Sequence, residues 1–258
     1  MAGRPPLSPF GSLGDVRRAG KVLRRAQIPQ GQRPTNEEVR QAREVVEAYR
    51  SAHAAPLNAA YMGLRSCITT EGFHPDVSRR LKRLPTIEDK LRRLPMMDLS
   101  TMQDIGGCRA VLDTQEQVQR VVERFRRNSH RRNEQPDRIK NYVKSPRDTG
   151  YRAIHIYTRY HRRRIEVQLR TPGQDLWAKL VEDLTHITGI DVKNGDGPDE
   201  AHELLRKLAA FLSMSESGQL PAGSLVDDLN MLVHDLNMLV ANTLMSANLS
   251  SPRIQENP

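Results

Sequence analysis

Apolar residues recur at helical spacing toward both ends of the chain and crowd into short runs near its centre. A spacing of three to four residues predicts an amphipathic helix. Two helices begin at capping signatures, Thr35 with Glu38 and Thr114 with Gln117. The helix after Thr114 carries its apolar residues on one face. Besides the helix after Thr114, the predicted helices cover 35–53, 56–69, 86–94, 174–187, 199–216 and 222–246.

Short apolar or alternating runs predict strands in the middle of the chain. A short strand falls within 73–85, and the others cover 108–112, 139–143, 152–159 and 164–170. Tyr160–Arg163 joins the last two strands, which predicts a hairpin. Strands in the centre with helices before and after them indicate an α+β or a mixed α/β fold.

The same patterns divide the chain into three parts. Residues 1–34 mix Pro, Gly, Arg and Ser without periodicity, which predicts a mostly disordered basic arm. Residues 35–218 form the folded domain, and 219–258 form a C-terminal helix and tail. That helix carries a leucine seam, which fits docking on its own domain, a homo-oligomer contact or a groove-binding partner. The seam consists of Leu229, Leu232, Leu236 and Leu239.

Composition narrows the class of protein. Apolar residues make up 37% of the chain and charged residues 28%, which is too apolar for wholesale disorder. No run approaches the ~20 apolar residues of a membrane span, and the N-terminus has no apolar signal segment. Cys67 and Cys108 alone make neither a disulfide framework nor a zinc site. We therefore expect a cytoplasmic protein that does not bind membranes.

Positive charge gathers in the middle of the chain. The net charge is +9, yet residues 120–170 hold 16 basic against 5 acidic residues, a net of +11. Residues 171–258 hold 5 basic against 13 acidic residues. Clustered arginine favours a polyanionic partner such as RNA. The predicted basic patch comprises Arg126, Arg127, Arg131, Arg132, Arg162, Arg163 and Arg164.

The predicted strand 164–170 has the most informative polar pattern. Alternation sends Ile165, Val167 and Leu169 into the core, and it places Glu166, Gln168 and Arg170 in a row on the other face. This row offers an anion, an amide and a cation close together. A solvated strand face would have the same pattern.

The preceding strand makes a solvated face less attractive. If the two strands pair, Ala153, His155 and Tyr157 share one face beside it. Tyr151 follows Gly150, where the absence of a side chain lets a backbone or a ligand approach closely. The Tyr151 ring could then stack on a nucleobase.

A second acidic residue, Asp104, precedes the strand 108–112. The Gly106–Gly107 pair could bend the chain so that Asp104 and Arg109 approach one site. Carboxylates from two strands, Asp104 and Glu166, are the usual minimal equipment for holding Mg²⁺ beside substrate phosphates. An Asp that only caps a turn is the alternative. Three cations nearby in the sequence, Arg80, Lys82 and Lys90, suit a triphosphate, although surface helices often carry such charges.

Four ordered blocks together resemble the synthetase domain of the RelA/SpoT proteins, the alarmone synthetases. They are an R-x-K…K stretch, a D-[LI]-x-G-x-R strand, a P-[KR]-x-x-G-Y-[RQ]-x-[IL]-H block and E-[VL]-Q-[IL]-R-T. In this chain the blocks run from Arg80 to Lys90, from Asp104 to Arg109, from Pro146 to His155 and from Glu166 to Thr171.

The resemblance implies an α+β fold with a nucleotidyltransferase-like mixed β-sheet flanked by helices. It also implies that the protein is a pyrophosphokinase. The enzyme would move the β,γ-pyrophosphate of ATP to a 3′-hydroxyl with Mg²⁺. Asp104 and Glu166 would hold the metal, Glu166 would be a candidate base, and Gln168 would assist. The implied ATP ligands are Arg80, Lys82, Lys90, Arg109 and Arg147, and the implied acceptor ligands are Tyr151, Arg152 and His155.

Departures from the long family members narrow the resemblance. Arg147 stands where they usually have Lys, Asn141 stands where many have Asp, and the hydrolase signature H-D-x-x-E-D is absent. After Thr171 the chain looks like the toxic small alarmone synthetases, whose relatives act on nucleotides or on the 3′-CCA end of tRNA. We expect an antitoxin or a separate hydrolase as the neutralising partner.

The positive charge of residues 120–170 is larger than the binding of a free nucleotide requires. We therefore favour the 3′-CCA end of tRNA as the acceptor, which would make the protein a toxin that inhibits translation. The alternative acceptor is GDP or GTP, which gives (p)ppGpp, or an adenine nucleotide. A non-catalytic basic RNA-binding regulatory module is the remaining reading.

Overall fold

The computed structural model describes residues 9–27, 33–131 and 136–219, together with single helical positions between 227 and 241. Contacts divide the chain into two compact units. The first unit comprises residues 1–112, 116–140 and 155–169, and the second comprises residues 113–115, 141–154 and 170–258. The predicted boundaries at 34 and 218 stay predictions. In the described residues no helix is long and apolar enough to cross a membrane.

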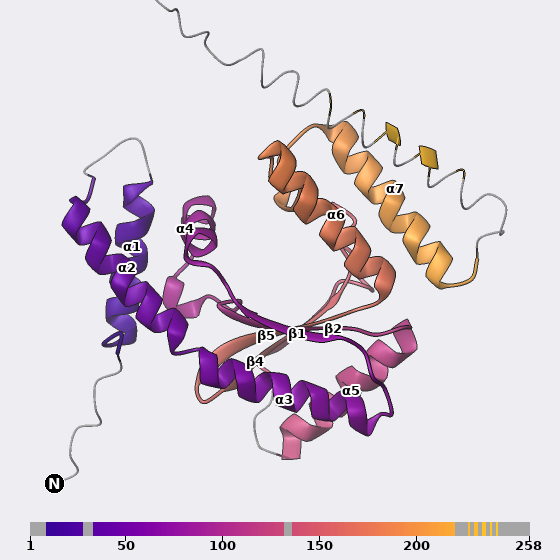
Figure 1. Ribbon diagram of the computed structural model, residues 1–258, viewed down its shortest axis with the longest axis horizontal. Helices are drawn as coiled ribbons and strands as arrows, with labels where there is room; N and C mark the ends of the chain where they lie inside the picture. Colours follow the sequence, from indigo (N-terminus) through magenta and orange to yellow (C-terminus); the bar gives the residue numbers. More distant parts are fainter. Residues whose placement is uncertain are drawn as a thin grey trace, which may run out of the picture. The chain divides into compact units, whose positions relative to one another are not determined.

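The first unit contains a five-stranded mixed sheet in the order β1-β2-β5-β4-β3 (Figure 1). The strands are β1 Val77–Leu81, β2 Gly106–Val111, β3 Arg138–Asn141, β4 Ile154–Tyr160 and β5 Arg163–Arg170. β1 pairs antiparallel with β2. The predicted hairpin is confirmed: β4 and β5 are joined through His161 and Arg162, whose positive φ angles of 47° and 64° suit a tight two-residue turn.

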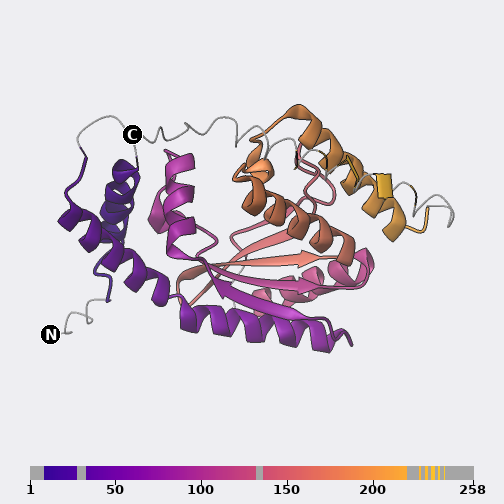
Figure 2. The ribbon, with the colours of Figure 1, turned by 45° about the horizontal axis from the view of Figure 1, so that its top comes forward.

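Helices α3 (Ala54–Thr70) and α5 (Gln115–Arg131) lie along the same face of this sheet (Figures 1 and 2). The apolar faces of the strands and of these helices form the core between them. Ile165, Val167 and Leu169 are each 0% exposed, and so are Val118 and Val121 of α5. The predicted inward set of β5 is therefore confirmed.

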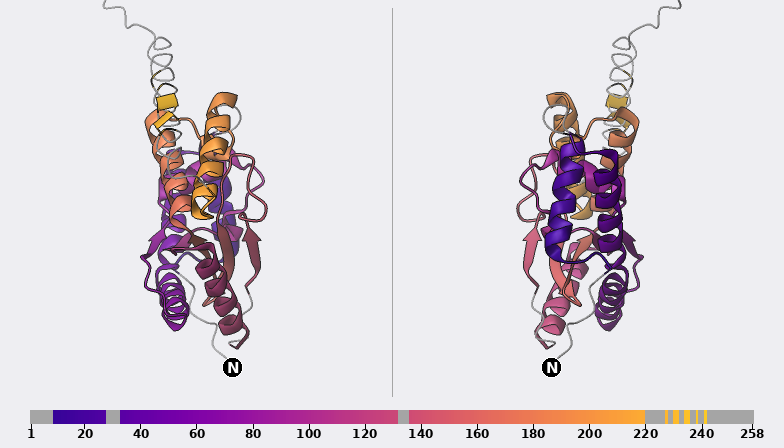
Figure 3. Two further views of the ribbon diagram at one scale, coloured as in Figure 1. Left: turned by 90° about the vertical axis from the view of Figure 1, so that its right-hand side faces the viewer. Right: turned by 90° about the vertical axis from the view of Figure 1, so that its left-hand side faces the viewer.

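The N-terminal arm differs from the sequence-based expectation. Leu13–Ala26 forms helix α1, which begins with a capping box between Ser12 and Asp15. Its Val16 and Leu23 are buried in a core shared with α2 (Asn36–Ser51) and α4 (Leu84–Arg93). Figure 3 shows α1 and α2 side by side. The arginines of this helix obscured its apolar stripe in the sequence: Arg17, Arg18 and Arg25 are exposed, whereas Arg24 is half-buried and donates to the Leu91 carbonyl of α4 at 3.0 Å. Residues 1–8 and 28–32 lie outside the described residues.

The second unit is built on α6 (Pro172–Thr188), the short helix η2 (Val192–Asn194) and α7 (Asp199–Glu216). Trp177 of α6 donates its indole N–H to the Leu205 carbonyl of α7 at 2.9 Å. Gly150 lies against α7 as well, and a Cβ there would stand 2.9 Å from the Ala209 Cβ. The close approach predicted at Gly150 is thus made by a helix of the same chain. The four seam leucines lie outside the described residues.

Candidate active site

The Asp104 carboxylate lies between two lysines in the first unit. Lys90 Nζ of α4 is 2.8 Å from Asp104 Oδ1, and Lys82 Nζ is 3.1 Å from Oδ2. Lys82 directly follows β1, where its N–H bonds the Ile105 carbonyl at 2.8 Å and its own carbonyl accepts from Arg50 Nε at 2.8 Å. These backbone bonds fix Lys82 beside the start of β2, so three of the predicted residues meet at one point.

The charges around Asp104 keep it ionised. Burial raises the pKa of this carboxyl group, but the attraction and hydrogen bonds of Lys82 and Lys90 outweigh burial and hold the pKa below its ordinary value. Two ammonium groups against one carboxylate leave the cluster with a net positive charge. A group with more negative charge can therefore replace Asp104 as the partner of these two lysines.

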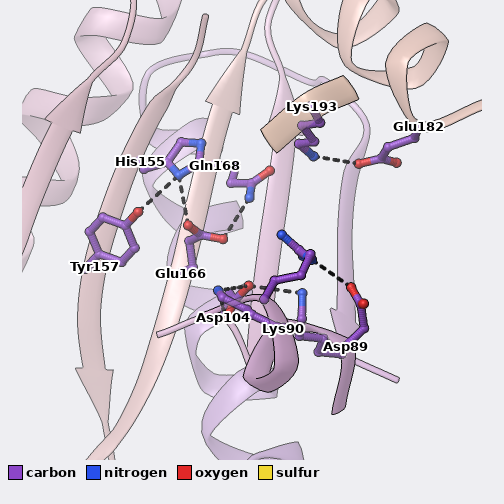
Figure 4. Close-up of polar contacts among 11 residues, drawn as sticks. Asp89, Lys90, Asp104, His155, Tyr157, Glu166, Gln168, Glu182 and Lys193 are labelled. Carbon is purple, nitrogen blue, oxygen red and sulfur yellow. Dashed lines mark hydrogen bonds and ion pairs between the residues drawn. The ribbon is translucent and has the colours of Figure 1, made fainter. Parts of the chain in front are cut away.

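Glu166 of β5 is only 8% exposed and is hydrogen-bonded at both oxygens. His155 Nδ1 of β4 lies 2.8 Å from Oε1, and Gln168 Nε2 donates to Oε2 at 2.8 Å (Figure 4). An ionised carboxylate only accepts, so His155 carries its proton on Nδ1. Tyr157 Oη stands 3.4 Å from the same nitrogen. The hairpin thus brings both strands' polar residues to one face, as the alternation predicted.

These hydrogen bonds set the ionisation of Glu166. Burial raises its pKa, and the nearby Asp104 charge raises it further, yet the contacts with His155 and Gln168 prevail and the pKa lies below its ordinary value. The Asp104 charge therefore acts on the Glu166 carboxyl group, which fits the prediction that the two carboxylates share one site. Figure 4 shows Asp104 and Glu166 side by side.

Two further predicted cations share this face of the sheet. Arg80 pairs with Gly107 in the β1–β2 register, and directly opposed residues of an antiparallel pair point to the same side. A Cβ on Gly107 would lie 3.7 Å from the Glu166 carbonyl of β5. Arg109 is two residues after Gly107 on β2 and therefore has the same orientation. The regular strand alone places Arg109 here, without the bend that the sequence led us to expect.

Tyr151 lies in the second unit and is 3% exposed. Its hydroxyl accepts from Arg170 Nη2 at 3.1 Å, and Arg170 Nη1 also contacts Asp175 Oδ1 at 3.0 Å. Trp177 packs against the ring with centroids 5.8 Å apart. Arg170 thus continues the β5 row, but it is buried at 1% exposure in this unit. Its role here is to hold the Tyr151 hydroxyl.

The Tyr151 ring is covered rather than open. The Arg147 guanidinium lies 5.6 Å from its centroid and also donates to the Tyr142 hydroxyl at 3.3 Å. Arg152 lines a crevice with Trp177 and Glu216. The predictions that Arg147 binds ATP and that Tyr151 stacks on a base therefore require Arg147 to leave this ring. Those predictions, and the meeting of Tyr151 with the acidic pair, stay predictions.

The basic patch is only partly available to a partner. Arg126, Arg127 and Arg162 are exposed, although Arg127 lies 3.6 Å from Glu71. Two of the hairpin arginines are used inside the first unit. The Arg163 guanidinium stacks 4.5 Å from the Phe10 ring centroid, and Arg164 Nη1 donates to the Thr101 carbonyl at 2.8 Å. The side chains of Arg131 and Arg132 lie outside the description.

The donor set of the acidic pair suits magnesium. Mg²⁺ is usually held by one or two carboxylates with water and substrate phosphates completing its coordination, and Asp104 and Glu166 supply two ionised carboxylates. Among the described residues, no group of three or more His, Cys, Asp or Glu side chains could hold a metal by itself. The residues present therefore fit a shared, substrate-completed site better than an all-protein cage.

Two side chains at these clusters were missed by the sequence reasoning as functional residues. Tyr157 was placed on the correct strand face but given no role, and its hydroxyl lies beside His155. Lys193 belongs to none of the four sequence blocks, and its Nζ stands 5.8 Å from the Tyr151 centroid. No short-range pattern could have connected Lys193 with a residue 42 positions earlier in the chain.

Comparison with known proteins gives a family for the central segment. Residues 79–186 match the family described as the region found in RelA / SpoT proteins. An uncharacterized protein of Mycobacterium tuberculosis is 34% identical over 128 residues, which cover 48% of this chain and 44% of that protein. The chain thus matches less than half the length of this relative. The GTP pyrophosphokinase YjbM of Bacillus subtilis is 28% identical over 152 residues, 54% of this chain and 70% of that protein.

Solved structures show the same fold. A GTP pyrophosphokinase family protein from Streptococcus pneumoniae superposes with a TM-score of 0.56 at 21% identity, covering 74% of this chain and 97% of that one. Small alarmone synthetase 2 from Bacillus subtilis gives 0.54 at 20% identity, covering 66% of this chain and 93% of that one. The predicted fold class, a mixed sheet flanked by helices, is confirmed.

Proposed function

We propose that the chain is a member of the RelA/SpoT family, whose model matches residues 79–186, and that it is a pyrophosphokinase. It transfers the β,γ-pyrophosphate of ATP to the 3′-hydroxyl of an acceptor. The relatives whose names state an activity are a GTP pyrophosphokinase and a small alarmone synthetase. These names support this class of reaction.

One observation carries the proposal: Asp104, just before β2, and Glu166 of the neighbouring strand β5 are ionised and interact electrostatically, and Lys82 and Lys90 contact Asp104. Phosphoryl-type transfer needs little covalent chemistry from the protein, so alignment and charge neutralisation supply most of the acceleration. Asp104 and Glu166 would hold Mg²⁺, which would neutralise charge that develops on the phosphate oxygens.

The residues of the chain have separable tasks in this reaction. Lys82 and Lys90 exchange their contacts with Asp104 for contacts with the phosphates of ATP. The acceptor O3′ forms a bond to the β-phosphorus while the bond from that phosphorus to the oxygen bridging the α-phosphate breaks, which releases AMP. The 3′-hydroxyl loses its proton to a carboxylate oxygen of Glu166, the candidate base. His155 and Gln168 keep that carboxylate oriented through their hydrogen bonds.

The test is transfer of label from ATP labelled at the γ-phosphate, with Mg²⁺, to deacylated tRNA, GDP and GTP offered separately. We expect label in an acceptor and release of AMP. Asp104→Asn should lower the rate by about 10²-fold or more, in line with removal of one electrostatic contact. Asp89→Asn is the matched control, because Asp89 also pairs with basic residues but is exposed and bonds Arg92 and Arg93. Absence of label in every acceptor, or equal loss in both variants, would refute the proposal.

For the acceptor we favour the 3′-CCA end of tRNA, which would make the protein an inhibitor of translation neutralised by an antitoxin or a separate hydrolase. The net charge of +11 over residues 120–170 supports this acceptor. Within the predicted basic patch, Arg126, Arg127 and Arg162 are exposed and could contact RNA.

A guanine nucleotide is the second candidate acceptor. The relative from Bacillus subtilis that is named a GTP pyrophosphokinase favours it. The contacts of Arg163 and Arg164 also favour it, because they engage two half-buried arginines of the predicted basic patch with partners in the first unit. Label in GDP or GTP but not in tRNA would select this candidate.

A further inference from the structure

The segment after α6 is built to hold one lysine in a fixed place. Gly189 ends α6 in the left-handed conformation at φ 71°, and Gly195 closes the short helix η2 at φ 99°. Between them Val192 is 5% exposed and belongs to the core of the second unit. Because its neighbour Val192 is anchored in this core, the backbone of Lys193 is fixed beside it.

Lys193 reaches from this segment toward Tyr151. Its Nζ lies 5.8 Å from the ring centroid, within the range of a cation–π contact. It also lies 3.1 Å from Glu182 Oε1, and the two side chains are 31% and 38% exposed (Figure 4). Half-exposed ion pairs contribute little net free energy, because water competes for both partners. Lys193 can therefore exchange Glu182 for another anion at small cost.

Two other cations near the Tyr151 ring have other tasks. Arg170 is 1% exposed and is held by Asp175 at 3.0 Å as well as by the Tyr151 hydroxyl. Arg147 is exposed, stacks on Tyr142 with 5.0 Å to that centroid and bonds its hydroxyl. In the proposed reaction Arg147 binds ATP. Because Arg170 is fixed by burial and Arg147 is assigned to ATP, Lys193 is the cation near the ring that we assign to the acceptor.

We propose that Lys193 binds the phosphate of the acceptor nucleotide. This inference rests on the proposed function, in which the acceptor base stacks on Tyr151. When the base takes the place of the cations over the ring, Lys193 turns from Glu182 to the phosphate attached to that nucleoside. The base would be read by an aromatic ring and its phosphate by a lysine from a different segment. Lys193 is then an acceptor-binding residue with no part in binding ATP.

The chain contains a reporter for this event. Trp177 is its only tryptophan, and its ring centroid is 5.8 Å from that of Tyr151. Occupation of the Tyr151 ring should change Trp177 fluorescence without any turnover. Titrations use guanosine against GMP and adenosine against AMP, in the absence of ATP, with equilibrium dialysis of the same ligands as a second measurement of the dissociation constants.

The decisive comparison is between Lys193→Gln and the wild-type protein with and without the ligand phosphate. We expect Lys193→Gln to weaken the binding of a monophosphate by about tenfold and to leave the binding of its nucleoside unchanged. Lys207→Gln is the matched control, because Lys207 is an exposed lysine of the same unit that bonds Glu203 at 2.9 Å. It should change neither.

Three results would overturn the inference: no preference for the monophosphate in the wild-type protein, an equal loss of nucleoside and monophosphate binding in Lys193→Gln, or a loss in Lys207→Gln as large as that in Lys193→Gln. In the transfer assay Lys193→Gln should raise the KM for the acceptor and leave the KM for ATP unchanged. Failure of the wild-type protein to transfer label would count against the proposed function, whereas the binding titrations judge Lys193 separately.

Discussion

Gly150 provides the sharpest test of how the second unit is built. Its φ of +87° lies in the left-handed region, and a Cβ there would stand 2.9 Å from the Ala209 Cβ, 3.2 Å from the Leu205 carbonyl oxygen and 3.3 Å from the Arg206 Cα. These contacts involve the body of α7, not the far end of a flexible side chain. Gly150→Ala therefore cannot be accommodated by a rotamer change alone.

The expected cost has two parts. A non-glycine residue in the left-handed conformation costs about 1–2 kcal/mol, and forcing an additional methyl group into a packed region costs about 1–3 kcal/mol. Gly150→Ala should therefore lower the free energy of unfolding by about 2–5 kcal/mol. Gly189→Ala isolates the first part, because Gly189 has a φ of +71° and nothing within 4 Å of its Cβ position.

Urea unfolding, followed by Trp177 fluorescence, gives the free energy of unfolding of both variants in the second unit, which contains both glycines. The difference between the two variants is the cost of the contact with α7. Equal destabilisation by Gly150→Ala and Gly189→Ala would refute the packing argument. Deletion of α7 cannot replace this comparison, because α7 also packs against Trp177, whose fluorescence reports unfolding.

Two more predictions concern the first unit. Burial lowers the pKa of His53 from 6.5 to about 4, although the bond from Nδ1 to the Tyr49 carbonyl partly offsets this effect. Between these two pH values the unfolded chain binds a proton at this residue and the folded chain does not. The free energy of unfolding should therefore fall as the pH drops from 6.5 toward 4. His53→Gln keeps a donor without titrating, and unchanged pH dependence of its unfolding free energy would exclude this origin. Arg126→Glu with Arg127→Glu should reduce labelling of tRNA by about tenfold at moderate salt while labelling of GDP stays constant; the exposed control Arg40→Glu should alter neither, and a parallel loss for tRNA and GDP would assign these arginines to catalysis.

Local pattern was sufficient for most elements and for the inward face of β5. The alternation around Glu166 predicted which residues enter the core, and Ile165, Val167 and Leu169 are fully buried. Capping residues located α2 at Asn36–Ser51 because the Thr35 and Glu38 contacts are local. The family resemblance was likewise readable, since its blocks are contiguous stretches whose order the sequence preserves.

Long-range contacts decided what local pattern could not. The stripe of α1 is stabilised by packing against α2 and α4, so its arginine-rich sequence looked disordered until the partner helices were present. Arg163 and Tyr151 carry residue types that suit a nucleic acid or a base, yet Arg163 stacks on Phe10, and Tyr151 is buried with Trp177. Sequence determined where charge and aromatic rings occur along the chain. Tertiary structure determined which of them are used up inside the protein, because burial and pairing depend on segments far apart in sequence.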